Sequence, residues 1–402
     1  MKVFAQAAQA MKVHESNENK RLRVAVLNRV FSPTGGGAER YSIALVEQLA
    51  SRHDIHVFAQ EIEHLWAGVT YHRVSTLLRR PRWFNQLWFA VITWWLTRHG
   101  FDVVHSHENT WHGNVQTVHV LPVKYNLFKD RHGFARAARW LKVLTSPRLL
   151  VYLALEKCRF MPKPKRQIVV TSDSLQIVMA ASYPGSVGAL SVITPGFSPA
   201  LNRSNQALAV GQDEARRKFS LPLTSKCLLL VANDFRKKGL PAALEALARL
   251  PAHYVLVVVG NPAQTPEFQA QISRLNLAMR VFFLGRLVDV AEAYRAANYL
   301  VHPTLEDTFG MAVLEAMAFR LPVLVSGPQF CGISGLLQHR VNAWLLNDPN
   351  DANALADAIQ TLEADEVLRT KIVSNAASFA AGYQWEDIAA QQEMVYRLAS
   401  GK

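Results

Sequence analysis

Three short segments of the 402-residue sequence carry groups suited to binding phosphates and sugar hydroxyls. The first, FSPTGGGAER (Phe31–Arg40), places Gly35, Gly36 and Gly37 before a helix expected from Tyr41 to Ala50. Glycines let the backbone approach a ligand closely, and a helix N-terminus presents free N–H groups to an anion. The segment is not G-x-G-x-x-G, so dinucleotide binding is not its first interpretation. A plain turn remains the alternative.

The second segment, Tyr299–Ser326 (YLVHPTLEDTFGMAVLEAMAFRLPVLVS), reads as strand, loop, helix and strand. Gly310 stands at the helix start, where backbone amides and the helix dipole favour a phosphate. Asp307 precedes this turn and Glu315 follows it, near the carboxyl end of a parallel strand, where open α/β sheets bind ligands. Two carboxylates around a phosphate-binding turn suit a nucleotide sugar. The alternative is that Glu315 is a solvated helix residue, although its neighbours are mostly apolar.

The third segment, NDFRKKG (Asn233–Gly239), follows an apolar strand and precedes a helix expected from Leu240 to Leu250. Arg236, Lys237 and Lys238 supply cations, and Asp234 is the only carboxylate expected to compete with them. Fixed positive charge at this place would stabilise a leaving diphosphate. A basic helix cap on the surface is the alternative.

The elements that must position these segments alternate between short β-branched runs and helical patterns, which predicts parallel sheets covered by helices. Val192–Pro199 (VITPGFSP) suits a hinge between two Rossmann-like halves. The expected domains are a loose extension at 1–20, halves at 21–190 and 191–382, and a final helix at 383–402. The expected strands are Leu22–Leu27, His53–Phe58, Val103–Ser106, Val115–His119, Ile168–Thr171, Cys227–Ala232, Tyr254–Val259, Val281–Leu284, Tyr299–His302 and Pro322–Val325.

Composition narrows the class of protein. With 50% hydrophobic and 19% charged residues, the chain is too apolar for disorder and too polar for a multispan membrane protein. A net charge of +13 implies an anionic partner: nucleic acid, phosphorylated metabolites or acidic lipid. Cys158, Cys227 and Cys331 form no C-x-x-C pair, which argues against a disulfide framework or zinc site and favours a reducing compartment. No convincing targeting signal opens the sequence.

The most apolar stretch, Trp83–Leu96 (WFNQLWFAVITWWL), is too short to span a bilayer. A buried helix is the simpler interpretation. An interfacial helix is the alternative, because four of its residues are tryptophans and arginines flank it.

A basic cluster lies between Lys124 and Arg148, where seven Lys or Arg residues accompany one acid, Asp130. A helix there places Arg136, Arg139 and Lys142 on one face and apolar residues on the other. This pattern favours a membrane surface, whereas a helix docked with its basic face in solvent is the alternative. No nucleic-acid-binding signature is found, which disfavours that partner. The expected membrane-binding residues are Lys124, Lys129, Arg131, Arg136, Arg139 and Lys142.

The order of these motifs resembles the retaining glycosyltransferases of family 4, which have the GT-B fold. Their signature is E-x7-E followed by A-M-A and a P-V strand. This sequence has D-x7-E from Asp307 to Glu315, then Ala316–Ala318 and Pro322–Val323. The resemblance covers nearly the whole chain and implies two Rossmann-like domains facing across a cleft, acceptor-side first and donor-binding second. The YQWE run at Tyr383 is similar to the family's final helix, which crosses back to the first domain.

Within the family, FRKKG and TPGFSP make the sequence most similar to lipopolysaccharide-core glucosyltransferases. The resemblance implies transfer of a hexose, with retention of configuration, from UDP-hexose to a lipid-linked glycan such as the lipopolysaccharide core. It implies a peripheral enzyme at the cytoplasmic face of the membrane. It also implies a front-face displacement in which the leaving diphosphate helps to deprotonate the acceptor, with no metal or other cofactor. A GT-B nucleotide-sugar epimerase and a basic nucleotide-binding protein without transfer activity are the alternatives.

By motif position, the resemblance implies that Glu315 holds the ribose, while Asp307 and the amides of Phe309, Gly310 and Met311 hold sugar and phosphate. Lys238, helped by Arg236 or Lys237, would neutralise the diphosphate. Two departures leave questions open: Asp307 replaces the usual Glu, with Glu306 adjacent, and the usual Gly-Arg pair is missing, so Arg236 or Arg203 would supply the arginine. The remaining implied residues are Gly35, Gly36 and Gly37 lining the cleft, His119 beside the transferred sugar, and Leu287 in the L-G-R-L loop that reads the nucleobase.

Overall fold

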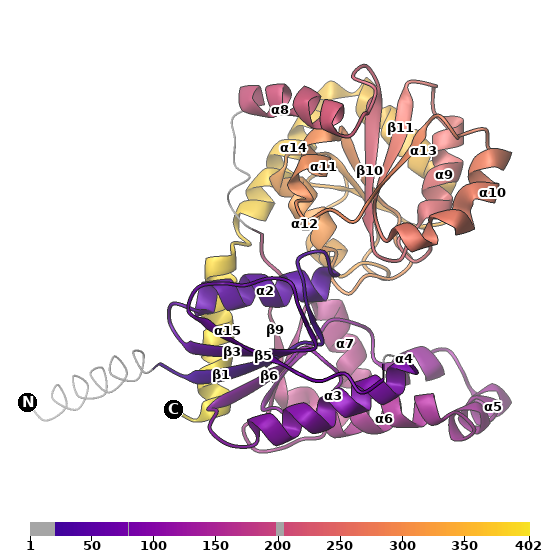
Figure 1. Ribbon diagram of the computed structural model, residues 1–402. Coiled ribbons are helices and arrows are strands. Elements are labelled where there is room, and N and C mark those ends of the chain that lie inside the picture. The colour runs from indigo at the N-terminus through magenta and orange to yellow at the C-terminus, as the bar shows by residue number, and fades with distance from the viewer. Residues whose placement is uncertain (1–20, 79, 198–204) are drawn as a thin grey trace, which may run out of the picture. The chain divides into compact units, whose positions relative to one another are not determined.

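The computed structural model describes residues 21–78, 80–197 and 205–402, and these residues form two compact units (Figure 1). The expected extension at 1–20 and the candidate Arg203 lie outside the described residues. The first unit runs to Val170 and also contains Val178–Ser191 and Ala389–Lys402. The second unit contains Thr171–Ile177 and Val192–Ile388. The division therefore differs from the expected one at 171–177 and places the last change of unit at 388/389 instead of 382/383.

The first unit is built on a seven-stranded sheet in the order β5-β3-β1-β6-β7-β8-β9. Strand β1 pairs in parallel with β3 on one side and with β6 on the other, as in a doubly wound sheet. Burial of β1 (RVAVL) and β8 (QIVV) on both faces explains their nearly continuous apolar sequences. The strands are β1 Arg23–Leu27, β3 Asp54–Ala59, β5 Val69–Arg73, β6 Val103–Ser106, β7 Val115–Val118, β8 Gln167–Val170 and β9 Leu190–Val192, and β2 Val30–Phe31 pairs separately with β4 Glu61–Ile62.

The second unit is built on a six-stranded parallel sheet in the order β12-β11-β10-β13-β14-β15. The chain moves from β10 to β11 on one side and returns to β13 on the other, so the order reverses between β10 and β13. Ligands of open α/β sheets bind at such a reversal, outside the carboxyl ends of the strands. The strands are β10 Lys226–Ala232, β11 Tyr254–Gly260, β12 Val281–Gly285, β13 Tyr299–His302, β14 Val323–Ser326 and β15 Trp344–Leu346.

Two apolar cores lie on opposite faces of this second sheet. One includes side chains from α8, α11, α12 and α14, and the other includes side chains from α9, α10 and α13 (Figure 1). Parallel sheets covered by helices in both units confirm the predicted pair of Rossmann-like halves. The helices are α8 Asn205–Lys218, α9 Leu240–Arg249, α10 Thr265–Arg274, α11 Ala291–Ala296, α12 Met311–Ala318, α13 Ala352–Ala364 and α14 Glu366–Ala381.

The helices of the first unit differ from the sequence predictions in two places. Helix α2 begins at Gly37 instead of Tyr41, so the third glycine is its first residue. Helix α3 buries Phe89 and Ala90, but Trp94 and Trp95 are exposed, so a fully buried helix is the wrong interpretation. The helices are α2 Gly37–Leu49, α3 Arg82–Thr97, α4 Val123–Phe128, α5 Gly133–Leu144, α6 Pro147–Phe160 and α7 Asp173–Ser182, and α15 Trp385–Ser400 has residues in both units.

Among the described residues, no helix combines the length and apolarity needed to cross a bilayer. In the first unit, two helices carry several exposed apolar side chains: Val91, Trp94, Trp95 and Leu96 on α3, and Phe134, Trp140, Leu141 and Leu144 on α5.

Candidate active site

The loops that follow β10 and β13 bring Lys238 and Asp307 together at the reversal point of the second sheet. The Lys238 ammonium lies 2.6 Å from Asp307 Oδ2 and donates a 3.0 Å hydrogen bond to the Glu306 carbonyl oxygen. Gly239 (φ 81°) makes this approach possible, because a Cβ atom there would lie 1.9 Å from the Pro303 carbonyl oxygen. A glycine at this position therefore lets the basic loop lie against the acidic loop.

The Asp307 carboxylate has two further partners. Nε2 of the buried His302 lies 3.0 Å from Oδ2, and the Phe309 amide donates to Oδ1 at 3.3 Å. Burial raises the pKa of the Asp307 carboxyl, but Lys238 and His302 lower it more, so its pKa lies well below the usual range. Burial lowers the pKa of His302 despite the neighbouring Asp307. Asp307 is therefore an ionised, hydrogen-bonded carboxylate.

The other two cations of the basic segment also have carboxylate partners. Arg236 pairs with Glu267 of α10, and Lys237 Nζ lies 3.0 Å from Glu306 Oε1. The expectation that Asp234 alone competes for these cations is wrong, because the partners come from loops and helices distant in sequence. Asp234 instead accepts a 3.0 Å bond from the Lys237 amide and shapes the loop.

The geometry also distinguishes the two adjacent acids. The side chain of Asp307 is 17% exposed and contacts Lys238, whereas that of Glu306 is 32% exposed and pairs with Lys237. Asp307 is thus the better placed of the two for the first acid role.

Helix α12 starts in a conformation that requires glycine. Gly310 has φ 102°, and a Cβ atom there would lie 2.8 Å from the Cys331 sulfur. In the first turn the Val313 amide donates to the Gly310 carbonyl at 2.9 Å, and binding of an anion by the amides of Gly310 and Met311 stays a prediction. The Phe309 amide already donates to Asp307 and is thereby occupied.

Glu315 lies half-buried on α12, and its Oε2 accepts a 2.6 Å hydrogen bond from the Tyr294 hydroxyl. Tyr294, on α11, is itself buried. This bond argues against a merely solvated helix residue, since it fixes the carboxylate on its helix. Sequence reasoning missed Tyr294, because an apolar helix 21 positions upstream gives no signal of this contact.

The L-G-R-L segment follows the end of β12. Gly285 adopts φ 71°, and the Leu287 side chain packs against the core on one face of the second sheet. The predicted reading of the nucleobase by the backbone of this loop stays a prediction.

A second grouping brings His302, Asp307 and Cys331 close enough for one ligand atom of each to hold a metal ion. The Lys238 ammonium, however, already lies 2.6 Å from Asp307 Oδ2, one of the two oxygens that Asp307 could offer a metal. Burial raises the pKa of the Cys331 thiol, which keeps it protonated at neutral pH. The donor set therefore suits an ammonium better than a divalent cation.

In the first unit, the triple glycine forms the start of α2. The Gly36 amide donates a 2.7 Å hydrogen bond to Glu39 Oε2. A Cβ atom on Gly35 would lie 2.8 Å from Glu39 Cβ, so glycine allows this side chain to fold back. One amide predicted to face a ligand is thus already bonded to Glu39, which caps the helix.

Strand β7 ends at Val118, so His119 is the first residue after the strand and not its last residue as predicted. Its Nε2 lies 2.8 Å from His107 Nδ1, and the two rings are stacked with centroids 5.2 Å apart. Burial and the nearby Arg159 lower the pKa of His119 to about 3, and burial with the neighbouring histidines lowers that of His107. Both rings are therefore neutral at pH 7. Sequence reasoning missed His107, although its place two residues after His105 at a strand end was a usable signal.

In the basic segment of the first unit, Lys124 has a structural role and most of the other predicted residues are exposed. Lys124 is an exception to the predicted membrane set, because its ammonium donates a 2.5 Å bond to the Ser182 carbonyl and lies over the Tyr183 ring. Lys129, Arg131, Arg136 and Lys142 are exposed, while Arg139 is half-buried.

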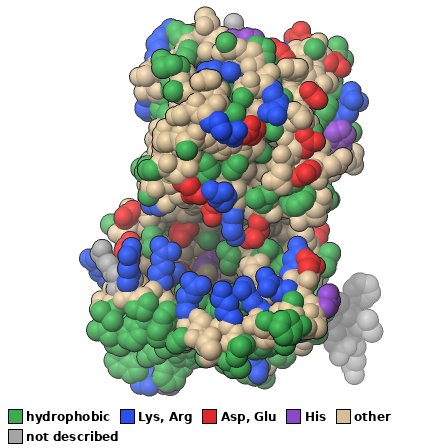
Figure 2. All heavy atoms as spheres, turned by 90° about the vertical axis from the view of Figure 1, so that its right-hand side faces the viewer, with side chains coloured by type: hydrophobic (Ala, Val, Ile, Leu, Met, Phe, Trp, Pro, Cys, Tyr) green, Lys and Arg blue, Asp and Glu red, His purple; other side chains and the backbone are tan. Residues whose placement is uncertain are grey.

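The apolar face of α5 is not docked on the unit. Phe134, Leu141 and Leu144 are 89%, 65% and 64% exposed, and Val143 is its buried residue. In Figure 2, the unit at the bottom shows basic side chains in a row beside large hydrophobic patches. The predicted alternative of a helix docked with only its basic face in solvent is therefore wrong.

Comparison with known families agrees with this architecture. Residues 35–201 match Glycosyltransferase Family 4, and residues 211–379 match Glycosyl transferases group 1. The fold and these matches define the GT-B class of glycosyltransferase proteins. More narrowly, the chain belongs to glycosyltransferase family 4, which confirms the resemblance read from its motifs.

The individual proteins that the chain resembles share little sequence identity with it. A 227-residue segment is 27% identical to the lipopolysaccharide glucosyltransferase WaaG of Escherichia coli K12, covering 56% of this chain and 58% of that protein. The chain thus matches little more than half the length of this curated relative. The crystal structure of WaaG, a glycosyltransferase involved in lipopolysaccharide biosynthesis, superposes with a TM-score of 0.80 at 21% identity, covering 94% and 100% of the two chains. Anabaena HepE in complex with UDP-glucose superposes with a TM-score of 0.73 at 20% identity, covering 93% and 99%.

Proposed function

We propose that this protein is a retaining glycosyltransferase that transfers a hexose from UDP-hexose to a lipid-linked glycan, such as a lipopolysaccharide core, at the cytoplasmic membrane surface. The observation that carries the proposal is the Lys238–Asp307 contact of 2.6 Å beside the N-terminus of α12. It joins a cation for the diphosphate, a carboxylate for sugar hydroxyls and a helix start for phosphate at the ligand-binding edge of one sheet.

In the proposed reaction, the bond between C1 of the hexose and the β-phosphate oxygen breaks as the acceptor oxygen bonds to C1 on the same face. The acceptor proton passes to the departing diphosphate oxygen. Lys238 and the amides of Gly310 and Met311 stabilise the negative charge that develops on the diphosphate. His119, neutral at pH 7, would contact the transferred sugar by hydrogen bonding, as the family resemblance implies.

The proposed donor is UDP-hexose. Glu315 offers a carboxylate for the ribose hydroxyls, and its bond from Tyr294 orients it. The complex of HepE with UDP-glucose and the name of WaaG as a glucosyltransferase support this choice by analogy.

We propose that no divalent metal takes part, since Lys238 supplies positive charge at Asp307. Activity unchanged by EDTA is the corresponding expectation.

The proposed membrane association is supported by two amphipathic helices of the first unit. Helix α5 exposes Phe134, Leu141 and Leu144 beside Arg136 and Lys142. Helix α3 exposes Trp94 and Trp95 near Arg98. Aromatic and apolar side chains next to cations suit the interface of an anionic bilayer.

A panel of UDP- and GDP-hexoses, each with and without lipid-linked acceptor, tests the activity by release of nucleoside diphosphate. We expect acceptor-dependent release from a UDP-hexose and a loss of about 10²- to 10³-fold in Lys238→Ala. Arg274→Ala removes an exposed cation of the same unit and should keep the wild-type rate. Donor turnover to an epimer without acceptor would identify the epimerase alternative, and nucleotide binding without turnover would identify a binding protein.

A further inference from the structure

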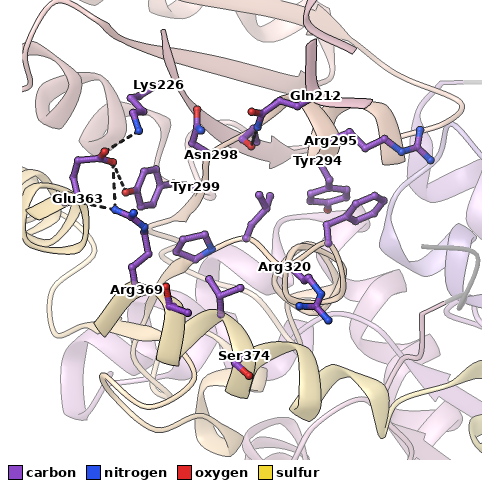
Figure 3. Close-up of a pocket in the computed structure, with 16 residues that line it drawn as sticks. Gln212, Lys226, Tyr294, Arg295, Asn298, Tyr299, Arg320, Glu363, Arg369 and Ser374 are labelled. Carbon is purple, nitrogen blue, oxygen red and sulfur yellow. Dashed lines mark hydrogen bonds and ion pairs between the residues drawn. The ribbon is translucent and has the colours of Figure 1, made fainter. Parts of the chain in front are cut away.

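A cavity of about 570 Å³ opens at the amino-terminal ends of strands in the second sheet, whereas the candidate active site lies at their carboxyl ends (Figure 3). Lys226 and Tyr299 are the first residues of β10 and β13, and Pro322 immediately precedes β14. Lys238 and Asp307 instead follow the far ends of β10 and β13. Because the seven residues of β10 span roughly 20 Å, the cavity is separate from the candidate donor site.

The cavity combines an apolar floor with a cationic rim. Tyr294, Phe319, Leu321 and Pro322 are buried lining residues. The charged side chains among the described lining residues are four cations and one carboxylate: Lys226, Arg295, Arg320, Arg369 and Glu363. Its volume lies within the roughly 300–1,000 Å³ of small-molecule sites, and guanidinium groups match the oxygens of phosphate.

The carboxylate is already engaged on one side of the cavity. Lys226 Nζ lies 2.7 Å from Glu363 Oε1, and the Tyr299 hydroxyl donates to Oε2 at 2.6 Å. Arg369 Nη1 lies further away, 3.9 Å from Glu363 Oε2. Figure 3 shows this group on one side and Arg295 and Arg320 on the other. On that second side, Arg295 Nη1 lies 3.5 Å from Glu292 Oε1, which is not a lining residue, so an incoming anion would share Arg295 with Glu292 and would not meet Glu363.

Arg320 occupies a backbone position that ordinarily favours glycine. Helix α12 ends in a Schellman motif, with the Leu321 amide bonded to the Ala316 carbonyl and the Arg320 amide bonded to that of Met317, each at 3.0 Å. Arg320 is the left-handed residue of this motif, with φ 59°. Five other described non-glycine residues also have a positive φ, so the feature that distinguishes Arg320 is that its side chain lines the cavity.

We propose that this cavity binds an organic phosphate, meaning a phosphate ester of a sugar or a nucleoside, and thereby changes the affinity of the donor site. The phosphate would lie against Arg295 and Arg320, and the organic part against Phe319 and Leu321. Tyr294 provides the connection, because its side chain lines the cavity and its hydroxyl donates to Glu315 at 2.6 Å. The connection rests on the proposed function of Glu315, whereas binding in the cavity does not.

Calorimetric titration of the full-length protein with glucose 1-phosphate, AMP and inorganic phosphate tests the site directly. We expect one equivalent of an organic phosphate to bind more tightly than inorganic phosphate, and binding to persist in the presence of saturating UDP. Arg320→Gly should weaken binding about tenfold through loss of a charge-assisted hydrogen bond. The same change relieves the left-handed strain, so an unaltered or raised melting temperature would show that the loss is not due to unfolding.

Matched variants separate this site from the donor site. Lys238→Ala should weaken UDP binding and leave organic phosphate binding unchanged. Arg295→Gln should weaken organic phosphate binding in the same way as Arg320→Gly. Equal binding by wild type and Arg320→Gly, displacement by UDP, or no detectable binding would each overturn the proposed site. These outcomes do not depend on whether the protein transfers a sugar.

The connection between sites has its own test. Bound organic phosphate should change the dissociation constant of UDP by at least about twofold, and UDP should change that of the phosphate by the same factor. Tyr294→Phe should remove this mutual effect while the cavity still binds its ligand. No mutual effect in the wild type would overturn the connection and leave the site itself intact. Absence of UDP binding altogether would instead count against the proposed function.

Discussion

The ammonium of Lys238 lies 2.6 Å from the carboxylate of Asp307, and this ion pair joins the loops that follow the neighbouring strands β10 and β13. The two groups have opposite effects on an incoming diphosphate, because Lys238 attracts it and Asp307 repels it. In the proposed reaction Lys238 binds the diphosphate, and the Asp307 carboxylate is suited to the sugar hydroxyls instead.

This relationship predicts opposite consequences for binding and turnover in Asp307→Asn. Removing the negative charge frees Lys238 for the diphosphate, so UDP should bind as tightly as in the wild type or tighter. Turnover should fall by about 10²-fold or more, because the sugar loses a charge-assisted hydrogen bond and its orientation. Calorimetry with UDP and initial rates with donor and acceptor measure the two effects. Loss of UDP binding in this variant would show that Asp307 has a structural role.

Glu315→Gln should weaken UDP binding about tenfold or more, since a neutral amide replaces a carboxylate that accepts from hydroxyl groups. Tyr294→Phe should produce a smaller loss, because it removes only the hydrogen bond that orients Glu315. Calorimetric dissociation constants check both, and Glu245→Gln, in the pair of Glu245 with Arg274 outside the candidate donor site, is the control. Normal UDP affinity in Glu315→Gln would remove Glu315 from the donor site.

Buried histidines should make the protein less stable in acid. Burial lowers the pKa of His105, His112 and His119 to about 3, below the value near 6.5 of an unfolded histidine. Between pH 6.5 and 3 the unfolded chain therefore binds more protons, so the free energy of unfolding falls as the pH falls. Each such histidine contributes about 1.4 kcal/mol per pH unit in this window.

His112→Phe tests this directly, because among the described residues neither ring nitrogen of His112 has a hydrogen-bond partner. The variant should lose roughly 2 kcal/mol less than the wild type between pH 7 and pH 5. Denaturant unfolding followed at both pH values measures the difference. Identical pH dependence in the two proteins would mean that His112 takes up its proton at the same pH in the folded and unfolded states.

Membrane binding should depend on the exposed apolar face of α5. Replacing Phe134, Leu141 and Leu144 by serine should reduce sedimentation with anionic vesicles by about tenfold or more, because each side chain contributes buried apolar area at the interface. Raised salt should weaken binding further through Arg136 and Lys142. Met279→Ser and Val367→Ser change exposed apolar residues of the second unit and serve as controls. Equal loss in the controls would indicate nonspecific adsorption.

Much of the fold could be predicted because the central strands are nearly continuous apolar runs. The strands that were missed have weaker patterns: β5 (VTYHR) is polar and lies at a sheet edge, while β2, β4, β9 and β15 have two or three residues each. Such short segments become strands only through their neighbours in the sheet, and sequence periodicity does not report those neighbours.

The candidate site shows the same limit. Lys238, Asp307 and Glu315 could be found from local motifs, since glycine turns and helix starts mark them. The partners of Arg236 and Glu315 could not, because Glu267 and Tyr294 reach these residues only through the folded chain. For the same reason, the exposed apolar face of α5 could not be distinguished from a docked one.

The central claim is transfer of a hexose with retention of configuration, and proton NMR of the glycosylated product tests it most directly. Starting from the α-anomer of UDP-hexose and a lipid-linked glycan acceptor, the proposed reaction yields an α-linked product together with one equivalent of UDP. A β-linked product, or conversion of the donor to an epimer with no glycosylated acceptor, would contradict it.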